Sequence, residues 1–186
     1  VVPSVSMAAA MLSSAPLVGT FHAALGRSVS RAIASAPMRL YMERIGVRIA
    51  VSEEARRTLI EHHGGDAVII PNGVETASFR TAQPLDQWVT TDERPVIVFL
   101  GRLDEPRKGL GIFAGAIERV LEAIPGARFL IAGRGDAPDI RAAVARFGDS
   151  VSFLGGISDE EKESLLAGAS IYVAPQTGGE SFGIVL

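Results

Sequence analysis

The stretch PVIVFLGRLDEPRKGL, residues 95–110, joins a buried strand to a strongly charged loop. Its first part is an apolar run of the kind that forms a strand covered on both faces of a parallel sheet. Its second part carries Arg102, Arg107 and Lys108 within seven residues. Charge at the end of a buried strand is costly unless it has a partner. The stretch therefore predicts either a bound anion or a set of ion pairs at this strand end.

Short apolar strands alternate with helical segments on both sides of this stretch. Strands are expected at residues 16–21, 47–52, 67–74, 95–101, 127–135, 151–155 and 170–175. Helices are expected at 3–14, 28–45, 110–123, 137–147 and 158–169, and one more begins after the capping residue Ser52. Ser158 and Glu161 are expected to form a capping box at the start of the helix at 158–169. Repeated strand–helix–strand units with short apolar strands indicate α/β domains built on parallel sheets.

The alternation is interrupted once, over residues 75–94, which have no sustained apolar period and are interpreted as a linker. We therefore predict two doubly wound, Rossmann-like domains, at residues 1–74 and 95–186. Both are expected to be incomplete, because the first shows about three strands where such domains usually have five or six. The chain does not begin with Met, which suggests a piece of a longer protein.

Composition excludes several classes of protein. The absence of cysteine rules out a disulfide scaffold and a thiolate metal site, and it fits a reducing cytoplasm. A net charge of −3 is unusual for a nucleic-acid-binding protein. Residues 1–60 hold seven Arg and three Glu, a net charge of +4 that suits either an anionic membrane surface or a solvated basic face. We expect no metal site, no signal peptide and no membrane span.

The cations after the strand at residues 95–101 lie where a ligand is expected. In open parallel sheets, ligands bind outside the carboxyl ends of the strands. Arg102 follows this strand end directly, and Arg107 and Lys108 precede the next helix. Arginine can donate two parallel hydrogen bonds to a phosphate, and lysine adds a compact positive charge, so these side chains together could bind a diphosphate. The alternative is a surface loop of ion pairs, because two acids stand between the cations.

The last residues, GGESFGIVL at 178–186, form a second candidate site. Glycine pairs let the backbone approach a ligand closely, and an uncapped helix N-terminus binds anions. Glu180 would repel a phosphate, so it fits a hydroxyl-bearing group such as a sugar. Alternatively, it is a first-turn acid that complements the helix dipole. The backbone amides that would face the anion belong to Ser181, Phe182, Gly183 and Ile184.

His22 is a third candidate, since it too follows an apolar strand. It would face a ligand cleft from the first domain, or it is a structural histidine without a functional role. The motif GRGD at residues 133–136 is interpreted as a turn. It lacks the third glycine of the dinucleotide-binding fingerprint.

Seven motifs in the chain resemble a known family. TFH, VSEEAR, IPNGVETASF, FLGRLDEPRKGL, FLIAGRGD, VSFLGGIS and GGESFGIVL occur in the order seen in the retaining GT-B glycosyltransferases of family 4. The resemblance covers nearly the whole chain. It implies a GT-B fold, with an acceptor-side domain ending near residue 74 and a nucleotide-sugar-binding domain from residue 95.

The resemblance also implies roles for individual residues. Arg102 and Lys108 match the pair that binds the donor diphosphate, and Arg107 matches the neighbouring cation. His22 and Glu180 match residues at the reacting sugar, and both are expected to be catalytic. The amides of Ser181, Phe182, Gly183 and Ile184 match those over the distal phosphate. Backbone atoms of Gly155, Gly156 and Ile157 match the segment that meets the nucleobase.

Within the family, the chain is most similar to actinobacterial members that move mannose from GDP-mannose to phosphatidyl-myo-inositol or its mannosides. The expected protein is a cytoplasmic enzyme, peripheral at the inner membrane face, with no cofactor beyond its donor. Two alternatives remain open: another donor such as UDP-glucose with a soluble acceptor, or a non-catalytic nucleotide-binding module. The family's second motif glutamate would fall past Leu186, and its N-terminal glycine-rich loop is missing. This chain alone is therefore expected to be a poor catalyst.

Overall fold

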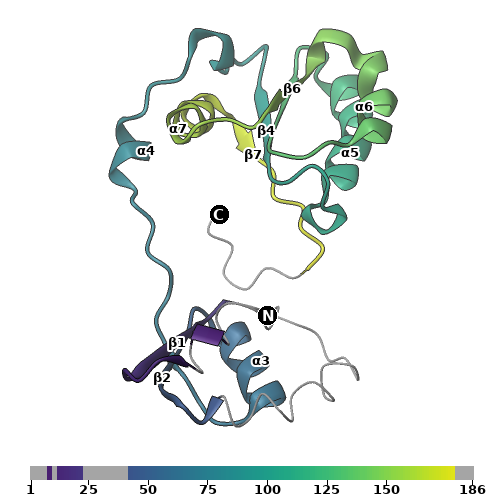
Figure 1. Cartoon of the computed structure of the whole chain (residues 1–186). Helices are drawn as coiled ribbons and strands as arrows, with labels where there is room; N and C mark the ends of the chain where they lie inside the picture. Colours follow the sequence, from purple (N-terminus) through teal and green to yellow (C-terminus); the bar gives the residue numbers. More distant parts are fainter. Residues whose placement is uncertain (1–7, 10–11, 23–41, 179–186) are drawn as a thin grey trace. The chain divides into compact units, whose positions relative to one another are not determined.

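The computed structural model describes residues 8, 9, 12–22 and 42–178 of the chain. These residues divide into two compact units, one ending at Gly73 and the other spanning Val74–Gly178. Each unit holds its own parallel sheet with helices beside it (Figure 1). The α/β class with parallel sheets, expected from the alternating pattern, is confirmed.

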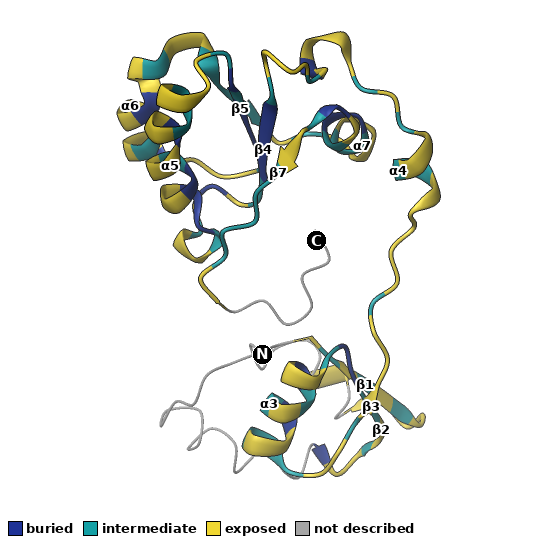
Figure 2. Cartoon of the chain, turned by 180° about the vertical axis from the view of Figure 1, so that it is seen from behind, coloured by how far each residue is buried: buried dark blue, intermediate teal, exposed yellow. Residues whose placement is uncertain are grey.

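The first unit contains a three-stranded parallel sheet in the order β1-β2-β3. Its strands are β1 (Leu17–Phe21), β2 (Ile45–Ala50) and β3 (Val68–Ile69). The helix α3 (Glu53–His63) packs on one face, where Ala50, Val51 and Ala55 form a small core. On the other face, Val18 and Val47 are paired neighbours and both are exposed within the described residues (Figure 2).

Two predicted helices of this unit fall largely outside the described residues. Of residues 3–14, the structure describes Ala8, Ala9 and Leu12 as helical. Of residues 28–45, only the last few are described, and Ile45 begins β2 rather than ending a helix.

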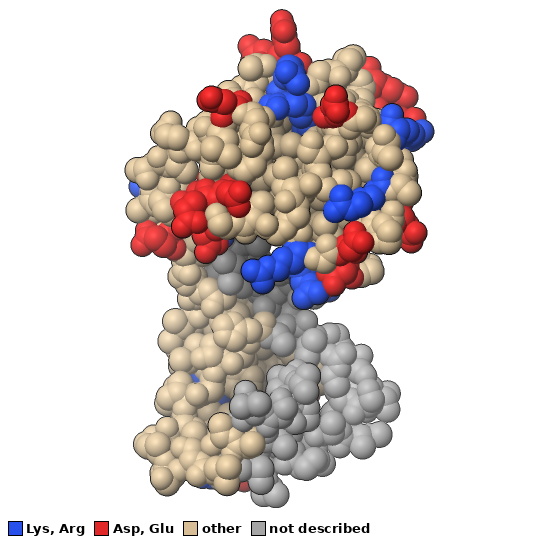
Figure 3. Space-filling model, turned by 45° about the horizontal axis from the view of Figure 1, so that its top comes forward, with Lys and Arg blue, Asp and Glu red and all other residues tan. Residues whose placement is uncertain are grey.

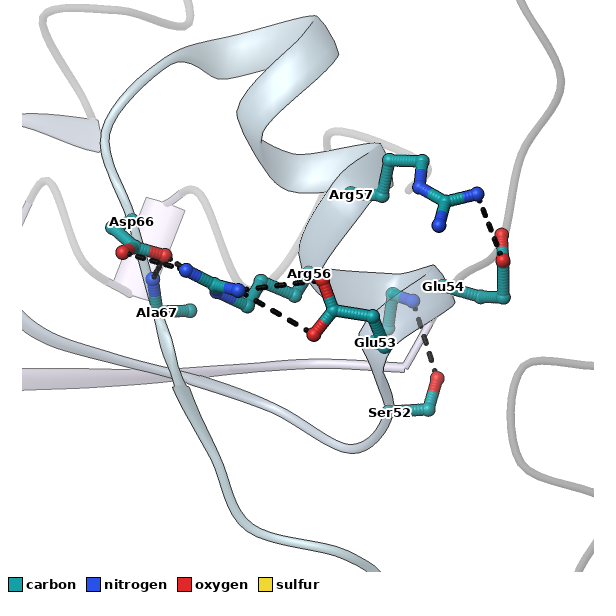
Figure 4. A network of polar contacts seen from close by, with 8 residues as sticks. Ser52, Glu53, Glu54, Arg56, Arg57, Asp66 and Ala67 are labelled. Atoms are coloured by element: carbon teal, nitrogen blue, oxygen red, sulfur yellow. Dashed lines mark hydrogen bonds and ion pairs between the residues drawn. The ribbon is translucent and has the colours of Figure 1, made fainter.

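Local side-chain contacts fix the position of α3, and Figure 4 shows them. The Ser52 hydroxyl accepts a hydrogen bond from the Ala55 backbone N–H, as its predicted capping role requires. Arg56 then joins the helix to the segment before β3 through two hydrogen bonds to Asp66, of 2.7 and 2.9 Å. The hydrogen-bonded guanidinium lowers the pKa of the Asp66 carboxyl to about 2. Arg56 also pairs with Glu53 in the first turn of the helix.

The second unit contains a four-stranded parallel sheet in the order β6-β5-β4-β7. Its strands are β4 (Val96–Leu100), β5 (Arg128–Ala132), β6 (Val151–Gly155) and β7 (Ile171–Tyr172). Its helices are α5 (Leu110–Ala123), α6 (Pro138–Val144) and α7 (Asp159–Gly168), with a 3₁₀ segment η3 (Ala145–Ser150) after α6. The predicted helix at 137–147 is thus divided between α6 and η3.

Helices cover both faces of this sheet, with α5 and α6 on one side and α7 on the other (Figure 1). On the α5 side, Phe113 packs between Phe99 and Phe129, with ring centroids 5.6 and 5.9 Å away. On the α7 side, Leu165 packs against strand residues of β4 and β5. The continuous apolar run in β4 follows from this arrangement, because successive side chains of the strand enter opposite cores.

The segment that joins the two sheets is packed over part of its length. It contains the short helices α4 (Ala77–Thr81) and η1 (Asp86–Trp88), and Trp88 is buried in the core on the α7 side. The hydroxyl of Ser164 on α7 accepts a hydrogen bond from the Leu85 N–H and donates one to the Gln83 carbonyl. Sequence periodicity did not predict this packing, because it depends on one large side chain and on backbone hydrogen bonds.

Candidate functional site

The strand order of the second unit identifies the place where a ligand is expected. The chain runs from β4 to β5 and then β6, and β7 lies on the other side of β4. The strand order therefore reverses between β4 and β7. Ligands of open α/β sheets bind outside the carboxyl ends of the strands at this kind of reversal, the topological switch point. The two loops that leave the sheet there are residues 101–109, after β4, and residues 173–178, after β7.

These two loops are in direct contact. The Thr177 N–H donates a hydrogen bond to the Arg107 carbonyl, with an N···O distance of 3.0 Å. Gly109 has a left-handed backbone, with φ of 81°, and a Cβ at this position would overlap the Pro175 carbonyl. Only glycine satisfies both conditions. The Lys-Gly pair before α5 therefore marks a close approach of the two loops, a role that sequence reasoning did not assign to Gly109.

The loop of residues 101–109, hereafter the cation loop, holds the three predicted diphosphate-binding cations. Arg102 follows β4, and Arg107 and Lys108 lie in the 3₁₀ turn η2 (Pro106–Lys108) just before α5. The cation loop also holds the ion pairs of the alternative interpretation. Asp104 binds Arg102, and Glu105 lies 2.8 Å from Arg107 and 3.4 Å from Arg102.

Three cations against two acids leave the cation loop with a net charge of +1. On the face of the second unit drawn in Figure 3, basic and acidic side chains stand next to one another. The hydrogen bonds between Arg102 and Asp104 lower the pKa of the Asp104 carboxyl and raise that of the Arg102 guanidinium. Both groups are therefore charged at neutral pH, and the diphosphate role of the cations stays a prediction.

Glycines at the carboxyl ends of the strands bring the cation loop against the turn after β5. The Gly101 N–H donates to the Ala132 carbonyl, and the Leu103 N–H donates to the Arg134 carbonyl. A Cβ at Gly133 would overlap the Gly101 carbonyl, and one at Gly135 would overlap the Asp104 side chain. The GRGD motif is thus a turn, as predicted, whose glycines allow this close contact.

A cavity of about 530 Å³ lies beside the cation loop at the starts of α5 and α6, and Thr177 of the loop after β7 also lines it. Its walls include the apolar side chains of Leu110, Ile112 and Ile140. Four carboxylates also line it, from Asp104, Glu105, Asp136 and Asp139. Three of these carboxylates are paired with arginines: Asp104 with Arg102, Glu105 with Arg107 and Asp136 with Arg141.

The predicted nucleobase segment begins at the carboxyl end of β6. Gly155 is the last residue of the strand and has a left-handed backbone, with φ of 71°. Gly156 lies against the Arg134 side chain, and Ile157 packs on the core beside α7. Ser158 then caps α7 in a capping box with Glu161, as the sequence predicted. The segment lies at the same edge of the sheet as the cation loop, since the strands are parallel.

The remaining predicted site residues divide into two groups. His22 belongs to the first unit and directly follows β1, at the carboxyl edge of that sheet. Outside the described residues lie Glu180, Ser181, Phe182, Gly183 and Ile184. Among the described residues, no group of three or more His, Asp or Glu side chains is arranged to hold a metal ion. No helix among them is both long and apolar enough to cross a bilayer.

A parallel sheet with charged loops at its switch point has the arrangement in which open α/β domains bind their ligands. Comparison with known proteins gives the family. Residues 94–186 match the family described as "Glycosyl transferases group 1", and residues 1–78 match "Glycosyltransferase Family 4". The chain belongs to these glycosyltransferases.

Individual relatives agree with this family. A phosphatidyl-myo-inositol mannosyltransferase of Mycobacterium tuberculosis is 42% identical over 99% of this chain and 48% of its own length. The enzyme of the same name from Propionibacterium freudenreichii is 36% identical over the whole chain and 46% of its own length. The chain thus spans about half the length of the curated relatives that it matches.

Solved structures support the fold. A glycosyltransferase of Rickettsia africae superimposes with a TM-score of 0.71, covering 97% of this chain and 50% of that one, at 19% identity. A sucrose-phosphate synthase of Thermosynechococcus elongatus gives 0.67, over 94% and 48% of the two chains, at 20% identity. Identities this low establish the shared GT-B type of fold and nothing about the substrate.

Proposed function

We propose that the complete protein is a retaining mannosyltransferase that moves mannose from GDP-mannose to phosphatidyl-myo-inositol or one of its mannosides. The observation that carries the proposal is the position of the cation loop at the switch point between β4 and β7. The names of the relatives, at 36–42% identity, supply the sugar and the acceptor.

The cation loop supplies the electrostatics that the reaction needs. Breaking the bond between the sugar and the diphosphate develops negative charge on the leaving phosphate. Positively charged groups that are already held in position stabilise this charge in the transition state. They lower the activation barrier because the site does not have to reorganise during the reaction. Arg102 supplies a planar fork, Lys108 a compact charge, and Arg107 a second guanidinium nearby. With these cations, the proposed reaction needs no metal ion and no cofactor besides the donor.

Retention of configuration requires either a double displacement or attack by the acceptor hydroxyl on the face of the sugar from which the diphosphate leaves. We favour direct same-face attack, in which the leaving phosphate oxygen takes the proton of the acceptor hydroxyl. His22 and Glu180 are assigned to the sugar, the former near the reacting face and the latter at the hydroxyl groups. The amides of Ser181, Phe182, Gly183 and Ile184 are assigned to the distal phosphate, and those of Gly155, Gly156 and Ile157 to the guanine.

The lipid acceptor places the reaction at a membrane surface. We propose peripheral binding to the cytoplasmic face of the plasma membrane. The net charge of +4 on residues 1–60 supports it, since basic segments are attracted to anionic lipids.

Transfer of labelled sugar by the full-length protein tests this proposal. The protein is incubated with phosphatidylinositol vesicles and with GDP-mannose or UDP-glucose in parallel. Mannosylated lipid formed from GDP-mannose alone is the expected result. Transfer of glucose from UDP-glucose instead would show that the proposed donor, GDP-mannose, is wrong. If GDP binds but neither sugar is transferred, the protein is a nucleotide-binding module and the proposed enzymatic function is wrong.

A further inference from the structure

Asp104 holds Arg102 by one edge of its guanidinium. Arg102 Nε donates to Asp104 Oδ1 over 3.0 Å, and Arg102 Nη2 donates to Asp104 Oδ2 over 2.7 Å. This is the forked geometry that makes arginine–carboxylate pairs directional. We propose that Asp104 is a positioning residue, which fixes the direction in which Arg102 presents its remaining N–H groups to the ligand phosphate. The inference rests on the proposed donor site.

The contacts of Arg102 leave one edge of the guanidinium for a ligand. Within the described part of the chain, Arg102 contacts Asp104 and Glu105, and these contacts use Nε and Nη2. The other edge of the guanidinium, formed by Nη1 and the second N–H of Nη2, takes no part in these contacts with Asp104 and Glu105. A guanidinium can bind a carboxylate on one edge and a phosphate on the other at the same time, since its donors lie in a rigid plane. Asp104 therefore occupies a different edge from the one assigned to the phosphate.

The turn after β5 fixes the position of Asp104. Its side chain lies directly against Gly135, where any Cβ would overlap it. The preceding residue, Leu103, is buried and donates its N–H to the Arg134 carbonyl. Gly135 and Arg134 belong to the GRGD turn, which the proposed function leaves without a role. We assign this turn a supporting role, because the Asp104 side chain packs against it.

Stabilising the fold is a weak explanation for this pair. The side chains of Arg102 and Asp104 are 58% and 41% exposed. Ion pairs with this much exposure contribute little to folding stability. An exposed arginine otherwise samples many rotamers, and ordering it upon binding opposes ligand binding. Asp104 orders the Arg102 side chain before the ligand binds, and this would raise the affinity for the phosphate. The effect would outweigh the repulsion between the Asp104 carboxylate and the phosphate.

Titration of GDP into the full-length protein, by calorimetry, tests the inference with a double-mutant cycle. Asp104→Asn keeps the shape of the side chain beside Gly135 but abolishes the forked ion pair. Asp136→Asn is the matched control, because it removes the same charge from the neighbouring turn, where Asp136 faces Arg141. We expect Arg102→Ala to weaken GDP binding about 10- to 100-fold. Asp104→Asn should weaken it about 3- to 10-fold, and Asp136→Asn less than about 2-fold.

The cycle separates this inference from the function on which it rests. In the Arg102→Ala background, Asp104→Asn should have almost no further effect, because Asp104 acts through Arg102. Unchanged binding by Arg102→Ala would overturn the donor site itself. If Arg102→Ala weakens binding but Asp104→Asn strengthens it or leaves it unchanged, Asp104 is not a positioning residue. An equal loss in both backgrounds would show that Asp104 acts through the fold.

A spectroscopic measurement on the unmutated protein keeps the inference testable if Asp104→Asn does not fold. The Arg102 Nε–H resonance, followed by nuclear magnetic resonance during GDP addition, reports the bond to Asp104. It should stay close to its starting position, since the pair persists in the complex. A large shift, with loss of protection from solvent exchange, would mean that the phosphate replaces Asp104 and would overturn the inference.

Discussion

The backbone N–H of Thr177 donates a hydrogen bond to the carbonyl of Arg107, so the loop after β7 is joined to the loop after β4. The contact connects residues that are 70 positions apart in the sequence. Gly109 lies beside Pro175 in the same contact. The conformation of the cation loop therefore depends on its neighbour at the switch point as well as on its own sequence.

Substitution of Gly109 tests this dependence. Alanine there would require a left-handed backbone and would overlap the Pro175 carbonyl, so the two loops must separate. We expect Gly109→Ala to weaken GDP binding by more than about 10-fold, as measured by calorimetry, because Arg107 and Lys108 move.

Gly111 is the matched control for this substitution. It lies two residues further on, inside α5, and a Cβ there meets nothing within 4 Å. Gly111→Ala should leave GDP binding unchanged and should raise the midpoint of thermal unfolding, because alanine favours a helix by about 0.5–1 kcal/mol over glycine. Equal binding by both variants would contradict the proposed role of the loop contact.

Lys108 is expected to act mainly through its charge. Lys108→Ala should weaken GDP binding by about 10-fold, and it should also make the affinity less sensitive to salt, since one screened attraction is lost. Titrations at several ionic strengths measure both effects. Arg119→Ala, on the exposed side of α5, removes the same charge at another place and should change neither. A salt dependence unaltered by Lys108→Ala would argue against a phosphate contact.

Much of the second unit was predictable because its signals are local. The bounds of α5 and β6 agree with those expected from the apolar pattern, and Ser158 and Glu161 form the expected capping box. β7 is shorter than its apolar run, because backbone pairing with β4 covers two residues only. Strand ends and caps depend on neighbouring residues, which a single sequence displays directly.

The contacts that build the candidate site were not predictable in the same way. No periodicity in the sequence specifies that β7 lies beside β4, so the switch point emerges from the sheet order. Gly135 stands in a recognisable turn, but its contact with Asp104 joins two separate loops. The charges of the cation loop predict a ligand at this strand end, and that stays a prediction, whereas the pairing of Arg102 with Asp104 is a matter of geometry.

The packed part of the segment before β4 gives a prediction about stability. Ser164→Ala removes the hydroxyl that satisfies both the Leu85 N–H and the Gln83 carbonyl. Losing these two part-buried hydrogen bonds should lower the free energy of unfolding by about 1–3 kcal/mol. Trp88 is the single tryptophan of the chain and is buried, so its fluorescence during urea unfolding measures the change. An unaltered midpoint would mean that this segment is not docked on α7.

The Arg56–Asp66 pair gives a prediction about pH. The pKa of Asp66 is lowered from 3.8 to about 2 by the hydrogen-bonded guanidinium of Arg56. A carboxyl with a lowered folded-state pKa adds stability above its unfolded pKa, and this contribution disappears as the pH falls from about 4 towards 2. The Asp66 carboxyl carbon, followed by nuclear magnetic resonance, should titrate near pH 2 and return towards 3.8 in Arg56→Ala. Titration near 3.8 without substitution would contradict the pair.

The most direct test of the donor site is a crystal structure of the full-length protein with GDP. We expect diphosphate oxygens within about 3.2 Å of the Arg102 guanidinium and the Lys108 ammonium group, outside the carboxyl end of β4. Arg102 should still be bound to Asp104 on its other edge. A diphosphate bound elsewhere, with both cations facing solvent, would contradict the central claim.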